Sequence, residues 1–220
     1  PYQLEDNPSH LNFPGDGKNV EYAEGVFVGY RYYDKKKMAV RWPFGHGLSY
    51  TTFEYSNVRV SADVLNDGST VTVYADIKNT GDRAGREVVQ VYASCPKGML
   101  QKELKRMVAF AKTETIPAGE TRQTKVWFDL SLLEAFHGGK SAWLLEKGEY
   151  YLLAGDSSEN AYPVACLAAE DTTETEKVRE ICPLLDALKE IAPDEALLLS
   201  KRQQMKEICE KEGLPRIPIV

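Results

Sequence analysis

The chain has 220 residues, an apolar fraction of 43%, an aromatic fraction of 10% and a formal net charge of −6. This acidic balance argues against nucleic-acid binding, because domains that bind nucleic acids usually carry a basic patch. No apolar stretch approaches the roughly 20 residues that cross a bilayer, so we expect no membrane span. The length fits one large domain or one domain with appendages.

The four cysteines are widely spaced and none belongs to a CxxC pair. They predict free buried thiols rather than a disulfide framework, which favours a cytoplasmic, bacterial-type setting. His10, His46 and His137 are too dispersed to predict a metal site, and we expect no cofactor. The chain begins at Pro1 rather than methionine, which indicates a processed product or a piece of a longer protein.

Residues 1–52 show no sustained helical or strand periodicity and are rich in Pro, Gly, Asn and Tyr. We expect an extended arm with one short strand at Gly25–Tyr33, and an ion pair between Arg31 and Asp34 that locks the arm in place. A segment this long without its own core is unusual inside a compact domain. The arm is therefore expected to lie across another body.

Residues 53–168 show short strands separated by turns. In Ser69–Lys78 the apolar residues alternate with polar ones, which is the pattern of a strand with one buried face. Further strands are predicted at Arg86–Cys95, Met107–Thr115, Thr121–Leu130, Ala142–Leu145, Glu149–Ala154 and Tyr162–Ala168. Ala142–Leu145 and Glu149–Ala154 are expected to form a hairpin. This series predicts a mainly β fold, a β-sandwich of the immunoglobulin or fibronectin type III kind.

Residues 169–220 are expected to form a short helical tail or linker. The acidic run Glu170–Glu180 is interpreted as a solvated linker or a helix start. An apolar stripe with helical spacing follows, interrupted by Pro183. A second helix is predicted at Ala196–Lys211, with Asp194 as N-cap and Gly213 as the C-terminal stop. We expect residues 214–220 to be extended.

Two stretches of the arm carry a family resemblance. Glu24–Asp34 reads EGVFVGYRYYD and Pro43–Ser56 reads PFGHGLSYTTFEYS. Almost letter for letter, they are similar to the segment that leaves the second catalytic domain of glycoside hydrolase family 3 enzymes and enters a C-terminal fibronectin type III-like domain. Asn79–Tyr92, the KELK segment at 102–105 and Gly155–Ser158 continue the resemblance.

The resemblance implies a parent enzyme that is a retaining glycosidase, often a β-glucosidase, and that works through two carboxylates. The family's nucleophile is an aspartate in a Ser-Asp-Trp-like motif on a (β/α)8 barrel, and its acid/base is usually a glutamate in the following α/β domain. No Asp of this chain precedes a Trp. We therefore assign no catalytic residue and predict that the chain is inactive alone, with the barrel and the α/β domain as its partners. A homo-oligomer is also possible.

Trp42, His46 and Tyr50 are the candidates for substrate binding. The aromatic faces of Trp42 and Tyr50 could stack on a sugar ring, and His46 could hydrogen-bond to it. The interpretation we favour is that all three hold the arm against a catalytic domain. Glu103 and Lys105 are interpreted as surface charges.

Two functions stay open at this point. One is a non-catalytic structural domain that braces the catalytic domains of a family 3 glycoside hydrolase. The other is a stand-alone carbohydrate-binding or interaction module, with glycan as its partner. The tail is open as well, since it departs from the ordinary family pattern. It is either a connector toward the barrel of a circularly permuted enzyme or an extension that packs back on the sandwich.

Overall fold

The computed structural model describes residues 1–179, 181–182, 188–192 and 195–220. The arm contains two 3-10 helices and one short α-helix: η1 (Leu4–Asp6), η2 (Pro8–Leu11) and α1 (Tyr30–Lys36). The predicted strand at Gly25–Tyr33 is wrong, because residues 23–26 form a turn and residues 30–33 belong to α1. Gly29 begins this helix with a φ of +57°, a conformation that favours glycine.

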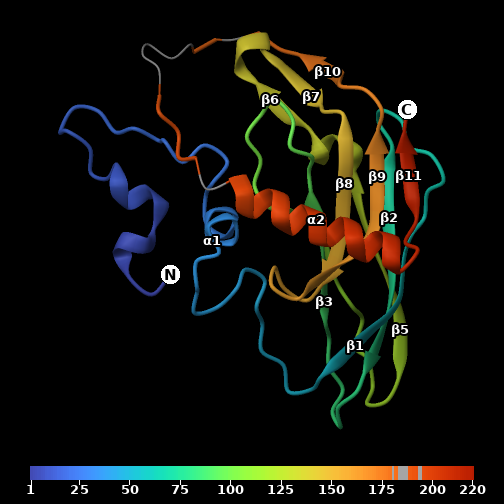
Figure 1. Ribbon diagram of the computed structural model, residues 1–220. Coiled ribbons are helices and arrows are strands. Elements are labelled where there is room, and N and C mark those ends of the chain that lie inside the picture. The colour runs from blue at the N-terminus through green and yellow to red at the C-terminus, as the bar shows by residue number, and fades with distance from the viewer. Residues whose placement is uncertain (180, 183–187, 193–194) are drawn as a thin grey trace.

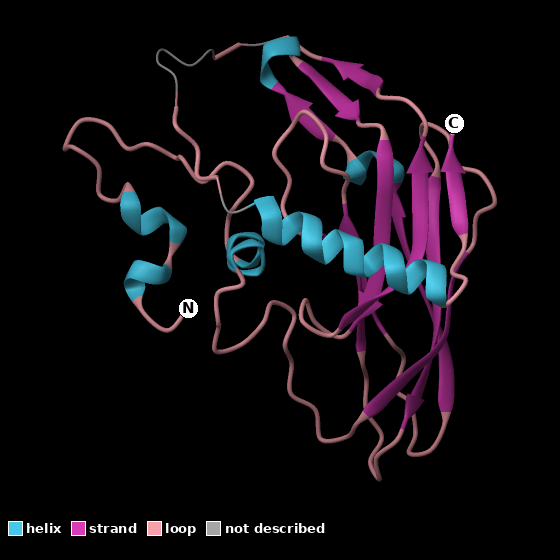
Figure 2. Ribbon diagram, in the orientation of Figure 1, coloured by secondary structure: helices cyan, strands magenta, loops and turns pink. Residues whose placement is uncertain are grey.

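Strands form two main sheets and one small sheet (Figures 1 and 2). The first sheet is antiparallel, in the order β1-β2-β5, with β1 (Phe53–Val60), β2 (Thr70–Asn79) and β5 (Thr121–Asp129). The second has the order β11-β9-β8-β3-β4, with β3 (Val88–Ser94), β4 (Arg106–Lys112), β8 (Gly148–Gly155), β9 (Ala161–Ala169) and β11 (Arg216–Ile219). The small sheet has the order β10-β7-β6, with β6 (Ala135–His137), β7 (Ala142–Leu145) and β10 (Thr173–Lys177).

The core lies between the two main sheets. In β2 the predicted alternation is confirmed, since the four apolar residues of one face are at most 1% exposed: Val71, Val73, Ala75 and Ile77. In β5, Val126 and Phe128 face the same core. Strand β3 differs, because both of its faces are buried. The outer face of β3 is covered by the arm at Gln90 and Tyr92 and by Arg202 at Ser94.

The predicted hairpin of β7 with β8 is wrong. Strand β7 pairs with β6 and β10, whereas β8 pairs with β3 and β9. The chain leaves the small sheet at Glu146, which is buried, and enters the large sheet at Gly148, whose φ is +135°. A buried charged residue with fixed partners at this corner directs the two strands into different sheets.

The tail packs back on the sandwich. Helix α2 (Glu195–Lys211) crosses the outer side of the large sheet over β8 and β9, as Figure 1 shows. Gly213 has a φ of +61° and Leu214 N donates to Cys209 O at 2.9 Å, which confirms the predicted C-terminal stop. Residues 216–219 are extended as β11, which runs parallel to β9.

Not every prediction for the tail is confirmed. The acidic run is not simply a solvated linker, because Thr173–Lys177 within it pairs with β7 as β10. Pro183, the apolar residues around it and the proposed N-cap Asp194 lie outside the described residues. Of the four cysteines, Cys95, Cys166 and Cys209 are buried free thiols as predicted, and Cys182 is exposed.

Candidate functional site

The sequence motifs that carry the family resemblance converge at one place, where the arm meets the outer face of the large sheet. We call this place the arm junction; it comprises Tyr30–Gly45 and the parts of β3, β4 and segment 97–105 that contact them. Gln90 of β3 lies at its centre. Its side-chain amide donates to Gly45 O at 3.1 Å and to Asp156 O, and its carbonyl accepts from Tyr92 OH at 2.5 Å. A Cβ at Gly45 would overlap this amide, so the loop needs glycine there.

Aromatic side chains extend the junction. The ring of Tyr30, in α1, stacks on Phe44 with centroids 4.3 Å apart and meets Tyr92 edge-on at 6.3 Å. The hydroxyl of Tyr30 accepts a hydrogen bond from Met107 N at 2.7 Å. Aromatic rings bury large area and need partners for their polar tips, and Tyr30 has both. It therefore joins the arm to β3 and β4.

Buried charges form a second set of contacts. Lys35 Nζ of α1 donates to Lys102 O at 2.9 Å. The side chain of Lys102 pairs with Glu146, and each of these two side chains is 3% exposed. Glu146 also accepts from Met99 N at 2.6 Å. Buried charges are tolerated only when they are paired and hydrogen-bonded, as these are.

The two residues interpreted as surface charges are not on the surface. Glu103 is 2% exposed and contacts Arg106 at 2.5 Å. Lys105 is largely buried and pairs with Asp34 at 3.1 Å. Among the described residues, the ion pair of Asp34 is thus with Lys105 rather than with Arg31. Burial raises the pKa of Asp34 above its ordinary value, although the Lys105 ammonium acts in the opposite direction.

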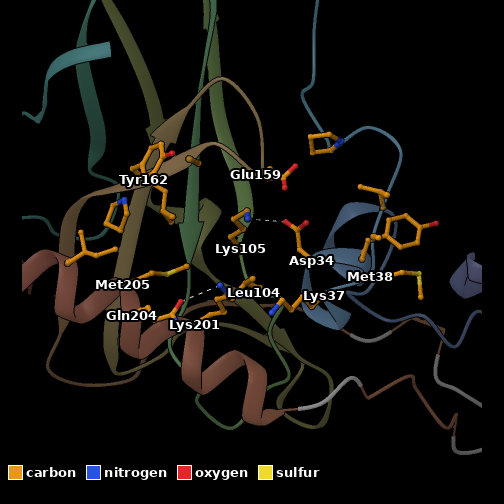
Figure 3. A pocket seen from close by; sticks show the side chains of 18 residues that line it. Asp34, Lys37, Met38, Leu104, Lys105, Glu159, Tyr162, Lys201, Gln204 and Met205 are labelled. Atoms are coloured by element: carbon orange, nitrogen blue, oxygen red, sulfur yellow. Dashed lines mark hydrogen bonds and ion pairs between the residues drawn. The ribbon is translucent and has the colours of Figure 1, made fainter. Parts of the chain in front are cut away.

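A pocket of about 520 Å³ lies next to the arm junction (Figure 3). Its walls are formed by α1 and the segment after it, by the β8–β9 turn, and by α2. Asp34 and Lys105 pair at 3.1 Å in its wall, and Glu159 lies beside them. Leu104, Leu153 and Met205 supply buried apolar lining. Its size is in the range of small-molecule sites.

The three candidates for substrate binding lie on the loop between α1 and β1. Trp42 is 63% exposed and stacks on His46, with centroids 5.1 Å apart and planes inclined by 14°. The guanidinium of Arg41 lies 5.7 Å from the Trp42 ring centroid. Tyr50 is 91% exposed. The structure thus brings Trp42 and His46 together, and the indole ring is in contact with the imidazole of His46 and near the guanidinium of Arg41.

Two of the three histidines, His10 and His137, lie in different elements of the fold. His10 lies in η2, and Nδ1 of His137 accepts from Lys140 N at 3.2 Å. Within the described ranges, no three His, Cys, Asp or Glu side chains gather in a way that could hold a metal ion. No helix in that part of the chain is long and apolar enough to cross a bilayer.

Sequence reasoning missed Arg202 of α2. Its guanidinium donates to Ser94 O at 2.7 Å, to Cys95 O at 2.6 Å and to Glu149 O, and it lies over the ring of Tyr151. An arginine in the middle of a helix with polar neighbours carries no local sign of burial. Ser94, which Arg202 contacts, is 108 positions away along the chain.

Comparison with known proteins agrees with this architecture. Residues 87–158 match the family model described as a fibronectin type III-like domain. The sandwich is a fibronectin type III-like domain. The chain is 35% identical over 210 residues to thermostable beta-glucosidase B of Acetivibrio thermocellus, covering 96% of this chain and 27% of that protein. That alignment includes residues of the helical tail, because the unmatched 4% is far shorter than residues 169–220.

Solved structures show the same similarity. A beta-glucosidase from Paenibacillus barengoltzii has a TM-score of 0.75 and 31% identity, covering 81% of this chain and 20% of that one. A GH3 beta-glucosidase of Bifidobacterium adolescentis has a TM-score of 0.71 and 36% identity, covering 78% of this chain and 25% of that one. The predicted resemblance to family 3 glycoside hydrolases is confirmed. The chain spans only about a fifth to a quarter of the length of these relatives.

Proposed function

We propose that this chain is a non-catalytic structural part of a family 3 glycoside hydrolase whose parent reaction is the retaining hydrolysis of terminal β-glucosides. In this role the sandwich braces the catalytic domains, and the arm is the segment that connects to them. The relatives are beta-glucosidases three to five times longer than the matched part, which supports a parent with further domains. Neither catalytic motif of the family occurs in these residues.

The observation that carries the proposal is the apolar surface of the arm. Half of the exposed large apolar side chains of the described residues belong to residues 1–52, which make up less than a quarter of the chain. In the loop before β1, Leu48 is 94% exposed and Tyr50 is 91% exposed. Apolar residues gathered on a surface mark an interaction site. A catalytic domain seated on the arm would remove this surface from water.

The alternative function, a stand-alone carbohydrate-binding module that uses Trp42, His46 and Tyr50, has less support. His46 stacks on Trp42, and Arg41 lies against the same indole. A sugar would have to compete with both groups for the ring. Tyr50 has an open face, but a single exposed ring is common on protein surfaces and carries no specificity.

The test compares Leu48→Asp in two proteins, the longer parent enzyme and the isolated 220-residue chain. In the parent we expect the charge to disturb the buried contact and lower the Tm by roughly 3–10 °C, with a loss of aryl-β-glucoside hydrolysis on heating. In the isolated chain, at concentrations low enough to keep it monomeric, the same substitution is expected to leave the Tm unchanged, because Leu48 is already exposed there. The isolated chain should not hydrolyse the glucoside.

Val64→Asp is the matched control, because Val64 is another exposed aliphatic residue in a loop, 56% exposed and outside the arm. It should leave the parent's Tm unchanged. Equal effects of Leu48→Asp and Val64→Asp in the parent would contradict the bracing role. Glucoside hydrolysis by the isolated chain would contradict its non-catalytic character.

A further inference from the structure

The tail is fastened to the sandwich at its C-terminal end. Strand β11 pairs with β9 along its length. Leu65, in the connection between β1 and β2, donates through its N–H to Pro218 O at 2.9 Å and accepts from Val220 N at 2.8 Å. Ile217 and Ile219 are 3% and 6% exposed and belong to the core between the two main sheets. The tail therefore supplies one strand of the sandwich.

The middle of the tail lies against both the sandwich and the arm. Helix α2 crosses the outer face of the large sheet, and Figure 1 shows α1 of the arm beside the first turns of α2. Leu198, Met205 and Cys209 of α2 form one apolar cluster with residues of β3, β8 and β9. Tyr30 of α1 packs against the same cluster. One apolar layer thus joins the arm, the sandwich and the tail.

Residues 188–192, which precede α2, contact the arm directly. Ile191 N donates to Ala23 O at 2.8 Å, and the carboxylate of Glu190 lies against Gly25. Ala23 is 4% exposed, whereas the only buried residue before it is Pro8. Sustained burial in the arm thus begins at the residue where the tail reaches it.

Phe27 lies where the arm, the tail and the sandwich meet. It lines a cavity of about 80 Å³ together with Leu198 of α2 and with residues 97–102, and both aromatic and aliphatic side chains are only 2% exposed. Lys97 pairs with Glu195 at 2.5 Å, which joins the segment 97–102 to the first turn of α2. The burial of Phe27 therefore needs the tail in place.

We propose that residues 188–192 and 195–220 form a strap that holds residues 23–36 of the arm on the sandwich, so that the release of one loosens the other. Contacts shared by two segments couple their local unfolding, and a coupling of this kind is reciprocal. The strap acts within the 220-residue chain and goes beyond the bracing role. Where a catalytic domain docks on the arm, the strap also fixes the conformation that this domain meets; this consequence alone rests on the proposed function.

Amide hydrogen exchange of the 220-residue chain, at concentrations low enough to keep it monomeric, tests the coupling. Leu198→Asp places a charge beside Phe27, and we expect the amides of residues 23–36 to exchange roughly tenfold faster or more, while those of β2 keep their protection. Leu199→Asp is the matched control, because Leu199 is the next residue of the same helix and is 48% exposed. Faster exchange confined to α2, or equal effects of the two variants on the arm, would overturn the proposal.

A milder variant decides the question if Leu198→Asp loosens the whole fold. Ile191→Pro removes the N–H group that donates to Ala23 O and lies outside α2. We expect it to speed exchange in residues 23–36 by roughly threefold to tenfold, the effect of one lost hydrogen bond. Ile191→Ala keeps the N–H group and is the control. An arm that exchanges no faster in Ile191→Pro than in Ile191→Ala would overturn the proposal.

A substitution in the arm tests whether the coupling is reciprocal. Phe27→Ala leaves the sequence of the strap unchanged, and it should speed amide exchange in residues 199–205 of α2. Phe13→Ala, at a 74% exposed position of the arm, is the control. Unchanged exchange of α2 in Phe27→Ala would overturn the coupling. These measurements use the isolated chain, whereas the bracing role is tested in the parent through Leu48, so either proposal can fail alone.

Discussion

Lys102 and Glu146 pair with each other inside the protein, and each side chain is only 3% exposed. Their neighbours complete the hydrogen bonding, since Met99 N donates to Glu146 Oε1 at 2.6 Å and Tyr150 OH donates to Glu146 O at 2.6 Å. A buried pair of this kind gives little net stability but is costly to break. Its effect is positional, because it fixes segment 97–102 where Lys35 of the arm can reach it.

The ionisation of Glu149 should make the stability of the fold depend on pH. The hydroxyl of Tyr151 donates to Glu149 Oε2 at 2.7 Å, and this hydrogen bond holds the pKa of Glu149 below its ordinary value of 4.5. Because the folded-state pKa is the lower one, the ionised carboxylate stabilises the protein above about pH 4.5, and this stabilisation is lost as the pH falls through the folded-state pKa.

Tyr151→Phe removes the hydroxyl and keeps the ring. We expect the pKa of Glu149 to rise toward 4.5, as followed by NMR titration of its side chain. The free energy of unfolding should then fall at pH 7, with a smaller further loss between pH 5 and pH 3 than in the unsubstituted chain. Tyr50→Phe, at a 91% exposed position, is the control. An unchanged Glu149 pKa in Tyr151→Phe would show that the hydrogen bond does not set it.

At the scale of elements, helix α2 depends on a polar contact as much as on an apolar one. Its buried residues are Leu198, Met205 and Cys209, a narrow stripe for 17 residues. Arg202 lies within this stripe and satisfies backbone carbonyls at the end of β3 and the start of β8. Burial lowers the pKa of Arg202, yet the side chain keeps its charge because an arginine pKa starts so high.

Arg202→Met should therefore destabilise the chain strongly. Several hydrogen bonds from a charged donor are lost and buried carbonyls are left without partners, so we expect a loss of roughly 2–4 kcal/mol in urea unfolding. Amide exchange in α2 should increase together with this loss. Lys206→Met removes an exposed pair with Glu210 at 3.9 Å and a weak electrostatic interaction with Glu149, and it should cost less than about 0.5 kcal/mol. Similar losses in both variants would show that Arg202 does not anchor the helix.

For the whole molecule, the uneven distribution of apolar surface is the main feature. The sandwich has a continuous core between its sheets, with a second cluster beneath α2. The arm is held at the junction by Tyr30, Lys35 and Asp34, but much of its apolar surface faces water. A surface of this kind is expected to find a partner.

In the isolated chain that partner would be another copy. We expect concentration-dependent self-association in sedimentation velocity experiments, despite a net charge of −6. The double variant Leu48→Asp with Tyr50→Asp should shift the chain toward monomer. Phe110→Asp with Trp127→Asp, at exposed positions of the sandwich, serves as the control and should leave association as it is. A chain that stays monomeric without substitution would contradict the view that the arm needs a partner.

The sequence by itself determined the sandwich and the resemblance to a family. Period-two alternation in residues 70–79 and 121–129 reflects one buried face, which is a local property. The arm and strand motifs are specific enough to show the resemblance to family 3 glycoside hydrolases. The division into an arm at 1–52, a sandwich at 53–168 and a tail at 169–220 stays a prediction, as do the roles of Trp42, His46 and Tyr50.

Only the tertiary structure decided the strand partners of β7, the burial of Glu103 and the pocket. Each depends on contacts between residues that are far apart along the chain. Lys35 and Lys102 are 67 positions apart, and Tyr30 and Met107 are 77 apart. A charged residue such as Glu103 looks the same in sequence whether it faces water or a buried arginine, because its environment is supplied by segments that folding brings to it.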